Sequence, residues 1–234
     1  MTGTQEGGAA HEGQPKTVFI ACAALGREVK QIIKKHGWHA EFQAIDARLH
    51  LRPAEIGPAV RERLEQTAGR YERRVVVYGH SGAMDLDDIL AEHDAVRPLG
   101  PHCYEMYGGE AFAQELKREP GTFILTDYLI HAWEMFVVRG LKLDQHPQLK
   151  PLLFRHYRRV IYFSQEKSDA LVTRAQEICD WLQLPLEVRH VGYGDLERRL
   201  EAIMTDQPQP TSAMTHDGYS AAAYPTAADG KAGD

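Results

Sequence analysis

Apolar, strand-like segments alternate with amphipathic, helix-like segments through the middle of the chain, and this order of elements constrains the fold most strongly. Alternation of this kind is typical of a mostly parallel sheet that carries helices on its faces. We therefore predict an α/β fold, a Rossmann-like three-layer structure with helices on both faces of one mostly parallel sheet. The segments expected as strands are 17–21, 41–45, 74–78, 122–126, 160–163 and 186–189.

The helices between these strands are predicted from apolar residues at helical spacing and from their end signals. The clearest covers 168–182, with Ser168 as its N-cap and Cys179 on its apolar face, where we expect core packing. The last helix is predicted over 195–204, with Asp195 as its N-cap. The other expected helices are 26–36, 54–71, 85–93 and one centred on Trp133.

The two ends of the chain differ in composition from its middle. Residues 1–15 and 205–234 are rich in Gly, Ala, Pro and small polar residues and show no apolar period. Segments of this composition bury too little apolar surface to offset the entropy of ordering them. We predict two disordered tails around a single α/β domain over 16–204, with two subdomains divided near residue 121 as the alternative.

Charge and hydropathy narrow the classes of partner and compartment. The formal net charge is −6, which argues against nucleic acid as the main partner. The sequence has no apolar run of the roughly 18 residues that a membrane helix needs, and its first residues do not read as a secretory signal. Three widely spaced cysteines are an odd number, and without export they are expected to be reduced thiols. We predict a cytoplasmic protein.

Reactive side chains follow several of the strand-like segments, at the point where each segment ends. In an open α/β sheet, ligands bind beyond the carboxyl ends of the strands, so these residues are expected to gather at one edge of the sheet. The stretch 94–99 is included as a weak strand. The residues in question are Cys22, then Tyr78, His80 and Ser81, then His102 and Cys103, and finally Thr126 and Asp127.

The segment 79–83, GHSGA, resembles a serine hydrolase elbow, in which G-x-S-x-G lies between a strand and a helix. Here Ala83 stands where the second glycine is required, and the only late candidates for triad partners are Asp169 and His190. A serine hydrolase that uses Ser81 is therefore a lesser alternative. A phosphate loop is not favoured, because neither G-x-x-x-x-G-K-[ST] nor G-x-G-x-x-G occurs.

The remaining interpretation is a metal site built from thiols and imidazoles. Cys22, His80, His102 and Cys103 are ligand types that zinc, iron or another thiophilic metal accepts. Their wide spacing makes the pattern less specific than paired C-x-x-C motifs. Glu28 follows Cys22 closely and is expected either to support the dipole of the next helix or to point into the same cleft.

Six short motifs occur in one order along the chain: IACAALGREV (20–29), LHLRP (49–53), VVVYGHSG (75–82), PLGPHCYEMYGGEAF (98–112), GTFILTDYLIHAW (121–133) and LEVRHVGYGDLERRL (186–200). Together, over roughly residues 17–203, they resemble the bacterial and archaeal family known as domain of unknown function 1638. The positions that match the family pattern are Cys22, Leu25 and Glu28, then Tyr78, Gly79 and Gly82, then Cys103 and Gly108.

The resemblance implies three cysteines brought together in a metal or metallocofactor site. It also implies a role near corrinoid-dependent methyl transfer or other one-carbon chemistry. The partners that it implies are a small molecule or metallocofactor, with a methyltransferase or a corrinoid protein as the protein partner. No reaction is assigned to the family.

The chain departs from the family pattern at three places. Ser81 stands where the middle cysteine is usual, Pro101 and His102 replace a His-Asp pair, and Ala23 replaces a glycine. Serine is a poor substitute for a thiolate ligand of a soft metal. The site is therefore either rebuilt around a histidine or degraded, and a degraded site would leave a non-catalytic accessory or chaperone protein.

In the rebuilt form, Cys22 and Cys103 would be metal ligands, with His80 or His102 completing the shell. Glu28 would act as a general base or as a partner of a ligand, and Ser81 would hold a water or a substrate. The residues predicted to bind the cofactor are Tyr78, Gly79, Gly82 and Thr126.

Overall fold

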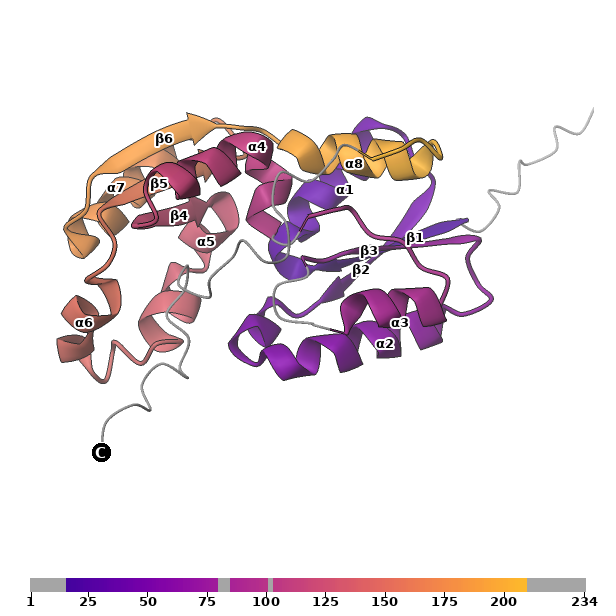
Figure 1. Cartoon of the computed structure of the whole chain (residues 1–234), viewed down its shortest axis with the longest axis horizontal. Coiled ribbons are helices and arrows are strands. Elements are labelled where there is room, and N and C mark those ends of the chain that lie inside the picture. Colours follow the sequence, from indigo (N-terminus) through magenta and orange to yellow (C-terminus); the bar gives the residue numbers. More distant parts are fainter. Residues whose placement is uncertain (1–15, 80–84, 101–102, 210–234) are drawn as a thin grey trace, which may run out of the picture.

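The computed structural model of the chain describes residues 16–79, 85–100 and 103–209. The prediction of a Rossmann-like, three-layer α/β fold is confirmed: all the strands are parallel and helices flank them (Figure 1). The strands do not form one sheet, however. The strands within the described residues form two sheets of three strands each, and the second begins after the first is complete in the sequence.

In the first sheet, β1 (Thr17–Cys22) lies between β2 (Ala40–Ile45) and β3 (Arg73–Val77). Every residue of β1 is buried, which explains its unbroken apolar sequence TVFIAC. One face of this sheet packs on α2 (Ile56–Thr67) and α3 (Leu86–Glu92), and the other packs on α1 (Gly26–Lys35).

In the second sheet, β5 (Arg159–Ser164) lies between β4 (Thr122–Thr126) and β6 (Leu186–His190). One face is covered by α5 (Asp127–His131), a π-helical turn (Glu134–Arg139), α6 (Lys150–Phe154) and α7 (Asp169–Leu182). The predictions for α7 hold: the Ser168 side chain accepts a hydrogen bond from Leu171 N, and Cys179 is fully buried among apolar side chains.

Two helices join the sheets. α4 (Cys103–Arg118) begins against the first sheet and ends against the second, and its helical path is broken at Gly109. α8 (Gly194–Met204) follows β6 and returns to the first sheet, where Leu196 and Leu200 enter the core. The chain therefore crosses twice between the sheets (Figure 1).

Three local expectations are corrected here. Asp195 is not the N-cap of the last helix, because α8 begins at Gly194 with Tyr193 before it, and Asp195 lies in the first turn. The stretch 94–99 is not a strand, since it contributes only an isolated bridge from Val96 to Val75. The helix expected around Trp133 is divided into α5 and the π-helical turn, with Trp133 between them.

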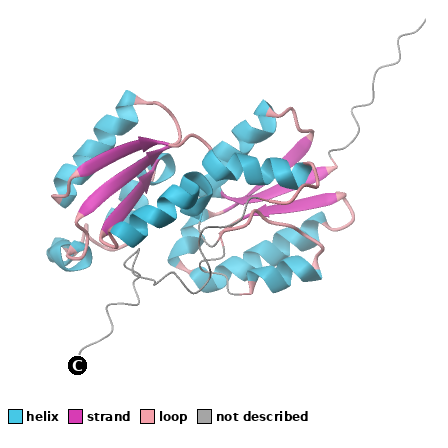
Figure 2. Ribbon diagram, turned by 45° about the horizontal axis from the view of Figure 1, so that its top comes forward, coloured by secondary structure: helices cyan, strands magenta, loops and turns pink. Residues whose placement is uncertain are grey.

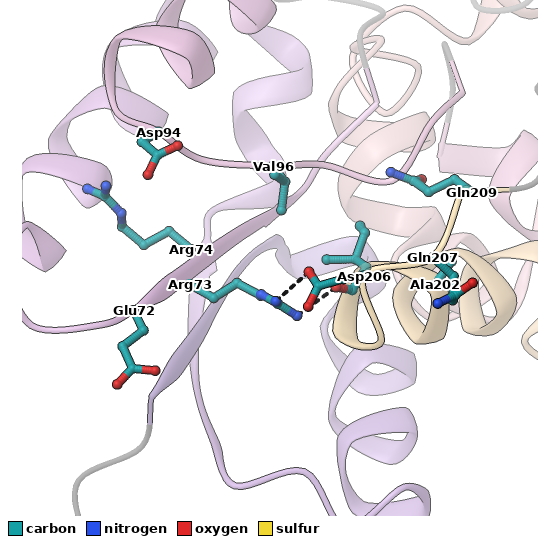
Figure 3. A pocket seen from close by; sticks show the side chains of 10 residues that line it. Glu72, Arg73, Arg74, Asp94, Val96, Ala202, Asp206, Gln207 and Gln209 are labelled. Carbon is teal, nitrogen blue, oxygen red and sulfur yellow. Dashed lines mark hydrogen bonds and ion pairs between the residues drawn. The ribbon is translucent and has the colours of Figure 1, made fainter.

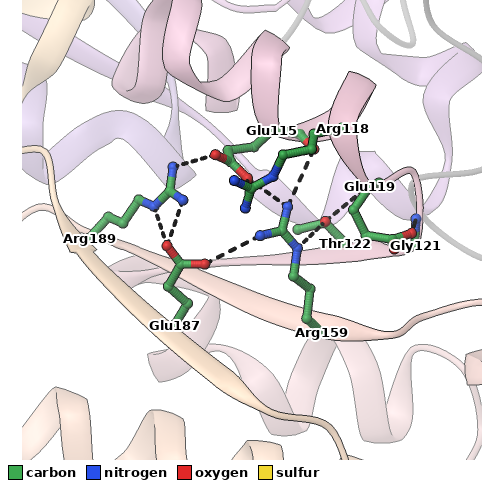
Figure 4. A network of polar contacts seen from close by, with 8 residues as sticks. All are labelled: Glu115, Arg118, Glu119, Gly121, Thr122, Arg159, Glu187 and Arg189. Atoms are coloured by element: carbon green, nitrogen blue, oxygen red, sulfur yellow. Dashed lines mark hydrogen bonds and ion pairs between the residues drawn. The ribbon is translucent and has the colours of Figure 1, made fainter.

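A polar network covers the part of the second sheet that faces α4 (Figure 4). The Glu115 carboxylate lies 2.6 Å from Arg159 and 3.0 Å from Arg189, and Glu187 pairs with both arginines. Arg118 also reaches Glu115, at 3.0 Å. These alternating acidic and basic side chains hold the C-terminal end of α4 against β5 and β6.

The carboxyl ends of the two sheets face each other in the middle of the molecule (Figures 1 and 2). Tyr128 and Phe136, which follow β4, pack against the core of the first sheet. Arg27, in the first turn of α1, forms a 2.8 Å ion pair with Glu166, which follows β5. The edge predicted to carry the reactive residues is therefore a junction between two sheets.

The single domain over 16–204 and the two disordered tails stay predictions. Of the predicted C-terminal tail, residues 205–209 are described, and there Gln209 accepts a hydrogen bond from Leu99 N and donates one to Arg97 O. None of the described helices combines the length and the apolar character that crossing a membrane requires.

Candidate functional site

Cys22 and His50 meet at the carboxyl end of the first sheet. Cys22 is the last residue of β1 and is fully buried, while His50 lies in a 3-10 helix (Ala47–Leu51) that follows β2. The Cys22 Sγ and His50 Nε2 atoms are 3.3 Å apart. Burial raises the pKa of the Cys22 thiol, and the nearby Cys103 raises it further.

Tyr78 packs against this pair from the end of β3. Its ring stacks on the His50 imidazole with centroids 5.6 Å apart, and its buried hydroxyl group interacts with the Cys22 thiol. The His50 ring is exposed on its outer side. Loss of solvent on the side that meets Cys22 and Tyr78 lowers the pKa of the imidazole, so the neutral, ligand-competent form is favoured.

Cys103 approaches the same region from the start of α4. Loss of solvent around its thiol raises the pKa of Cys103 to about 11, against the opposing effect of the Gly79 backbone N–H. Cys103 also contributes to the raised pKa values of Cys22 and Tyr78, which places its thiol within electrostatic range of both. Cys22, Tyr78, Gly79 and Cys103 therefore lie in one region at the carboxyl end of the first sheet, and their roles as ligands and cofactor-binding residues stay predictions.

Glu28 and Tyr107 form a second buried polar group beside these residues. Glu28, in the first turn of α1, is 4% exposed, and so is Tyr107 of α4. Burial raises the pKa of the Glu28 carboxyl, the Tyr107 phenol lowers it, and Asp127 of the second sheet raises it again. Neither Glu28 Oε2 nor the Tyr107 hydroxyl completes a hydrogen bond to any described residue. Buried polar atoms of this kind are rare in folded proteins, and an ordered water, an ion or a catalytic role accounts for most of them.

Removal of the Tyr107 hydroxyl is expected to leave stability nearly unchanged. Because the hydroxyl makes no completed hydrogen bond, Tyr107→Phe is expected to change the free energy of unfolding by no more than about 0.5 kcal/mol. The matched control is Tyr162→Phe, whose hydroxyl donates a 2.6 Å hydrogen bond to Asp127 Oδ1 and whose loss is expected to cost about 1–3 kcal/mol. Urea unfolding measures the stability of both variants. Equal losses of unfolding free energy in the two would contradict the prediction for Tyr107.

The Glu28→Gln variant is expected to gain stability relative to the wild type as the pH rises. The folded-state pKa of Glu28 is raised by burial, so the protonated carboxyl contributes its full stability below the pKa of the unfolded chain. That contribution is lost as the pH rises through the folded-state pKa, and glutamine has no such loss. Urea unfolding at a series of pH values measures the difference, with the exposed Glu65→Gln as control. A difference that does not vary with pH would contradict the prediction.

On the second sheet, the two strand-end residues have structural partners. Asp127 accepts hydrogen bonds from the Tyr162 hydroxyl and from the backbone N–H groups of Gln165 and Glu166, at 2.6 Å, 3.0 Å and 2.9 Å. The Thr126 hydroxyl caps α5 by accepting a hydrogen bond from Leu129 N at 3.3 Å. Thr126, predicted to bind a cofactor, is thus occupied as a helix cap.

Four of the predicted site residues lie outside the described part of the chain: His80, Ser81, Gly82 and His102. Their roles as metal ligands, as a catalytic serine and as a cofactor-binding glycine stay predictions, and so does the serine hydrolase alternative. Within residues 16–79, 85–100 and 103–209, no three His, Cys, Asp or Glu side chains gather closely enough to hold a metal ion.

Two residues of the site were missed by reasoning from the sequence. His50 lies within the motif LHLRP, and Tyr107 lies within PLGPHCYEMYGGEAF. Both motifs contributed to the family resemblance, but neither His50 nor Tyr107 was given a role. The histidine of LHLRP could have indicated a further metal ligand, because imidazole and thiolate ligands commonly bind the same metal ion.

A cavity of about 340 Å³ opens at the other end of the first sheet (Figure 3). It lies between the start of β3 and the end of α8. Arg73 on its wall donates to the Ile203 carbonyl at 2.6 Å and pairs with Asp206 at 2.7 Å. Its charged wall thus serves to attach the chain after α8, and it lies apart from the strand ends that carry the candidate site.

Comparison with known proteins gives one match. The family model described as "Protein of unknown function (DUF1638)" matches residues 44–200. The match includes His50, Tyr78 and Cys103 but begins after Cys22 and Glu28. No curated protein and no solved structure matches the chain.

Proposed function

The chain belongs to the DUF1638 family of proteins of unknown function, and from this premise we propose that it binds a metal ion or metallocofactor between its two sheets. The observation that carries the proposal is the contact between Cys22 Sγ and His50 Nε2 at the carboxyl end of β1. Cys103 is the third candidate ligand, because its thiol is an electrostatic neighbour of Cys22.

The donor set fits a soft or borderline metal such as zinc or iron. A buried thiol next to a neutral imidazole supplies one sulfur and one nitrogen ligand, a combination found in tetrahedral zinc sites. With Zn–S near 2.3 Å and Zn–N near 2.0–2.1 Å, two ligands of one tetrahedral ion lie about 3.5 Å apart. The 3.3 Å separation of Cys22 and His50 is close to that value.

Burial of Cys22 makes metal uptake at this site dependent on pH. Burial and the neighbouring thiol both oppose ionisation of Cys22, so an isolated thiolate would be strongly disfavoured there. A metal ion reverses this preference, since a coordinating thiol is deprotonated. The site would therefore release protons when it takes up the metal, and its affinity would rise with pH.

Glu28 and Tyr107 supply the groups that could move a proton beside such a site. Burial raises the pKa of the Glu28 carboxyl, which makes it a better proton acceptor than an exposed carboxylate. The resemblance extends the proposal to corrinoid-dependent methyl transfer or other one-carbon chemistry, with a methyltransferase or corrinoid protein as partner.

Metal analysis of the full-length chain tests the proposal. We expect about one zinc or iron per chain after purification without chelators, and a cobalt(II) titration that saturates near one equivalent with thiolate-to-cobalt absorption. Less than about a tenth of a metal per chain, together with no cobalt absorption, would overturn the proposal.

A further inference from the structure

A buried ion pair joins α8 to the start of α4, apart from the groups proposed to bind the metal. Arg199 of α8 and Glu105 of α4 are both fully buried, and Arg199 Nη2 lies 3.6 Å from Glu105 Oε1. Asp195, one turn before Arg199, lies 3.6 Å from the same nitrogen. Arg199 is among the largest fully buried side chains described.

Arg199 also holds the backbone that precedes α4. Its Nη1 donates a hydrogen bond to the Leu99 carbonyl oxygen. At Gly100 the backbone has a φ of +122°, and a Cβ atom there would lie 2.6 Å from Arg199 Nη1. Only glycine therefore allows this close approach of chain and guanidinium.

These contacts lie on both sides of Cys103 in the sequence. Leu99 and Gly100 precede it, and Glu105 follows it in the first turn of α4. A single guanidinium thus holds the chain before and after the cysteine. A buried ion pair adds little net stability on average, because desolvation of the two charges offsets their attraction. A role in fixing one geometry explains its presence better than a role in stability.

We propose that Arg199 is a positioning residue that holds Cys103 beside Gly79 and Cys22. The consequence for metal binding rests on the proposed function, but the positioning of the thiol does not. Arg199 acts through the Leu99 carbonyl before Cys103 and the Glu105 carboxylate after it, and it touches none of the candidate ligands in the described contacts.

Alkylation of the three free cysteines by iodoacetamide, followed peptide by peptide with mass spectrometry, tests the proposal in the full-length chain. In Arg199→Met we expect Cys103 to react at least about tenfold faster at pH 8, because a released thiol regains solvent and ionises more readily. Cys179, in the core of the second sheet, is expected to keep its wild-type rate.

The matched control is Arg159→Met, which removes an arginine from a partly buried ion pair, with Glu115, in the second sheet. It is expected to leave the Cys103 rate unchanged. If Arg199→Met does not fold, the double variant Glu105→Gln/Arg199→Met, which leaves no buried charge of the pair, is measured instead. Arg199→Lys is expected to restore most of the protection, since it keeps the charge near Glu105.

An unchanged Cys103 rate in a folded variant would overturn the proposal. An equal increase at Cys22, Cys103 and Cys179 would also overturn it, because that result indicates global opening. Loss of thiolate-to-cobalt absorption in the same variant would link the positioning to metal binding. If the wild-type protein binds no cobalt, the proposed function fails while the alkylation result stands on its own.

Discussion

Replacement of Cys22 with alanine is expected to weaken zinc binding by about a hundredfold or more. Loss of a group that only supports a ligand typically costs 10–100-fold, and Cys22 is proposed as a ligand itself. The effect is expected to be large because Cys22 supplies the buried thiol in contact with His50. Competition against a chromophoric chelator measures the affinity directly.

Cys179→Ala is the matched control for this prediction. It removes an equally buried thiol from the core of the second sheet, so the loss of packing is comparable. We expect its zinc affinity to equal that of the wild type. His50→Ala is expected to weaken binding in the same direction as Cys22→Ala. Equal affinities of Cys22→Ala and the wild type would remove Cys22 from the site.

Gly194→Ala is expected to destabilise the protein by about 2–5 kcal/mol, the largest loss of stability that we predict. Gly194 has a φ of +51°, where a side chain is strained, and a Cβ atom there would overlap the carbonyl oxygen of Tyr107. The backbone of α4 would have to move away from α8. Such a shift would also displace Tyr107 from its place beside Glu28.

The Gly192→Ala variant separates the strain of a positive φ from the steric overlap with Tyr107. Gly192 has a similar φ of +58°, but no atom lies within 4 Å of the position its Cβ would take. Only the conformational penalty applies there, about 1–2 kcal/mol. Urea unfolding measures both variants. Similar losses of stability in the two variants would show that the close approach of α8 to Tyr107 does not add to the cost of Gly194→Ala.

The strands could be predicted because their signal is local. The segment TFILT was expected at 122–126, and β4 covers the same residues. Every residue of β4 is buried although it is an edge strand, so its sequence is a nearly continuous apolar run. The signal for the N-cap at Ser168 was equally local. A serine followed by apolar residues at helical spacing is enough to predict the start of a helix.

The sequence did not predict α4, because no single face of this helix is apolar along its whole length. Its first turns pack on the first sheet through Met106, and its later turns pack on the second sheet through Phe112. The break at Gly109, where φ is +52°, changes the direction of the helix between these two environments. Because the buried face of the helix changes at this break, its apolar residues do not recur at one constant helical spacing.

Local sequence was sufficient for the fold class, for the parallel strands and for the position of Cys22 at a strand end, because each depends on neighbours close in the chain. The division into two sheets was not encoded in any local pattern, since pairing between strands depends on contacts far apart in sequence. The same is true of the site. Cys22 meets His50 across 28 residues, and Glu28 meets Tyr107 only because α4 crosses the junction between the sheets. These contacts arise from packing of the whole chain, which alone decided which thiol, imidazole and carboxyl groups share one environment.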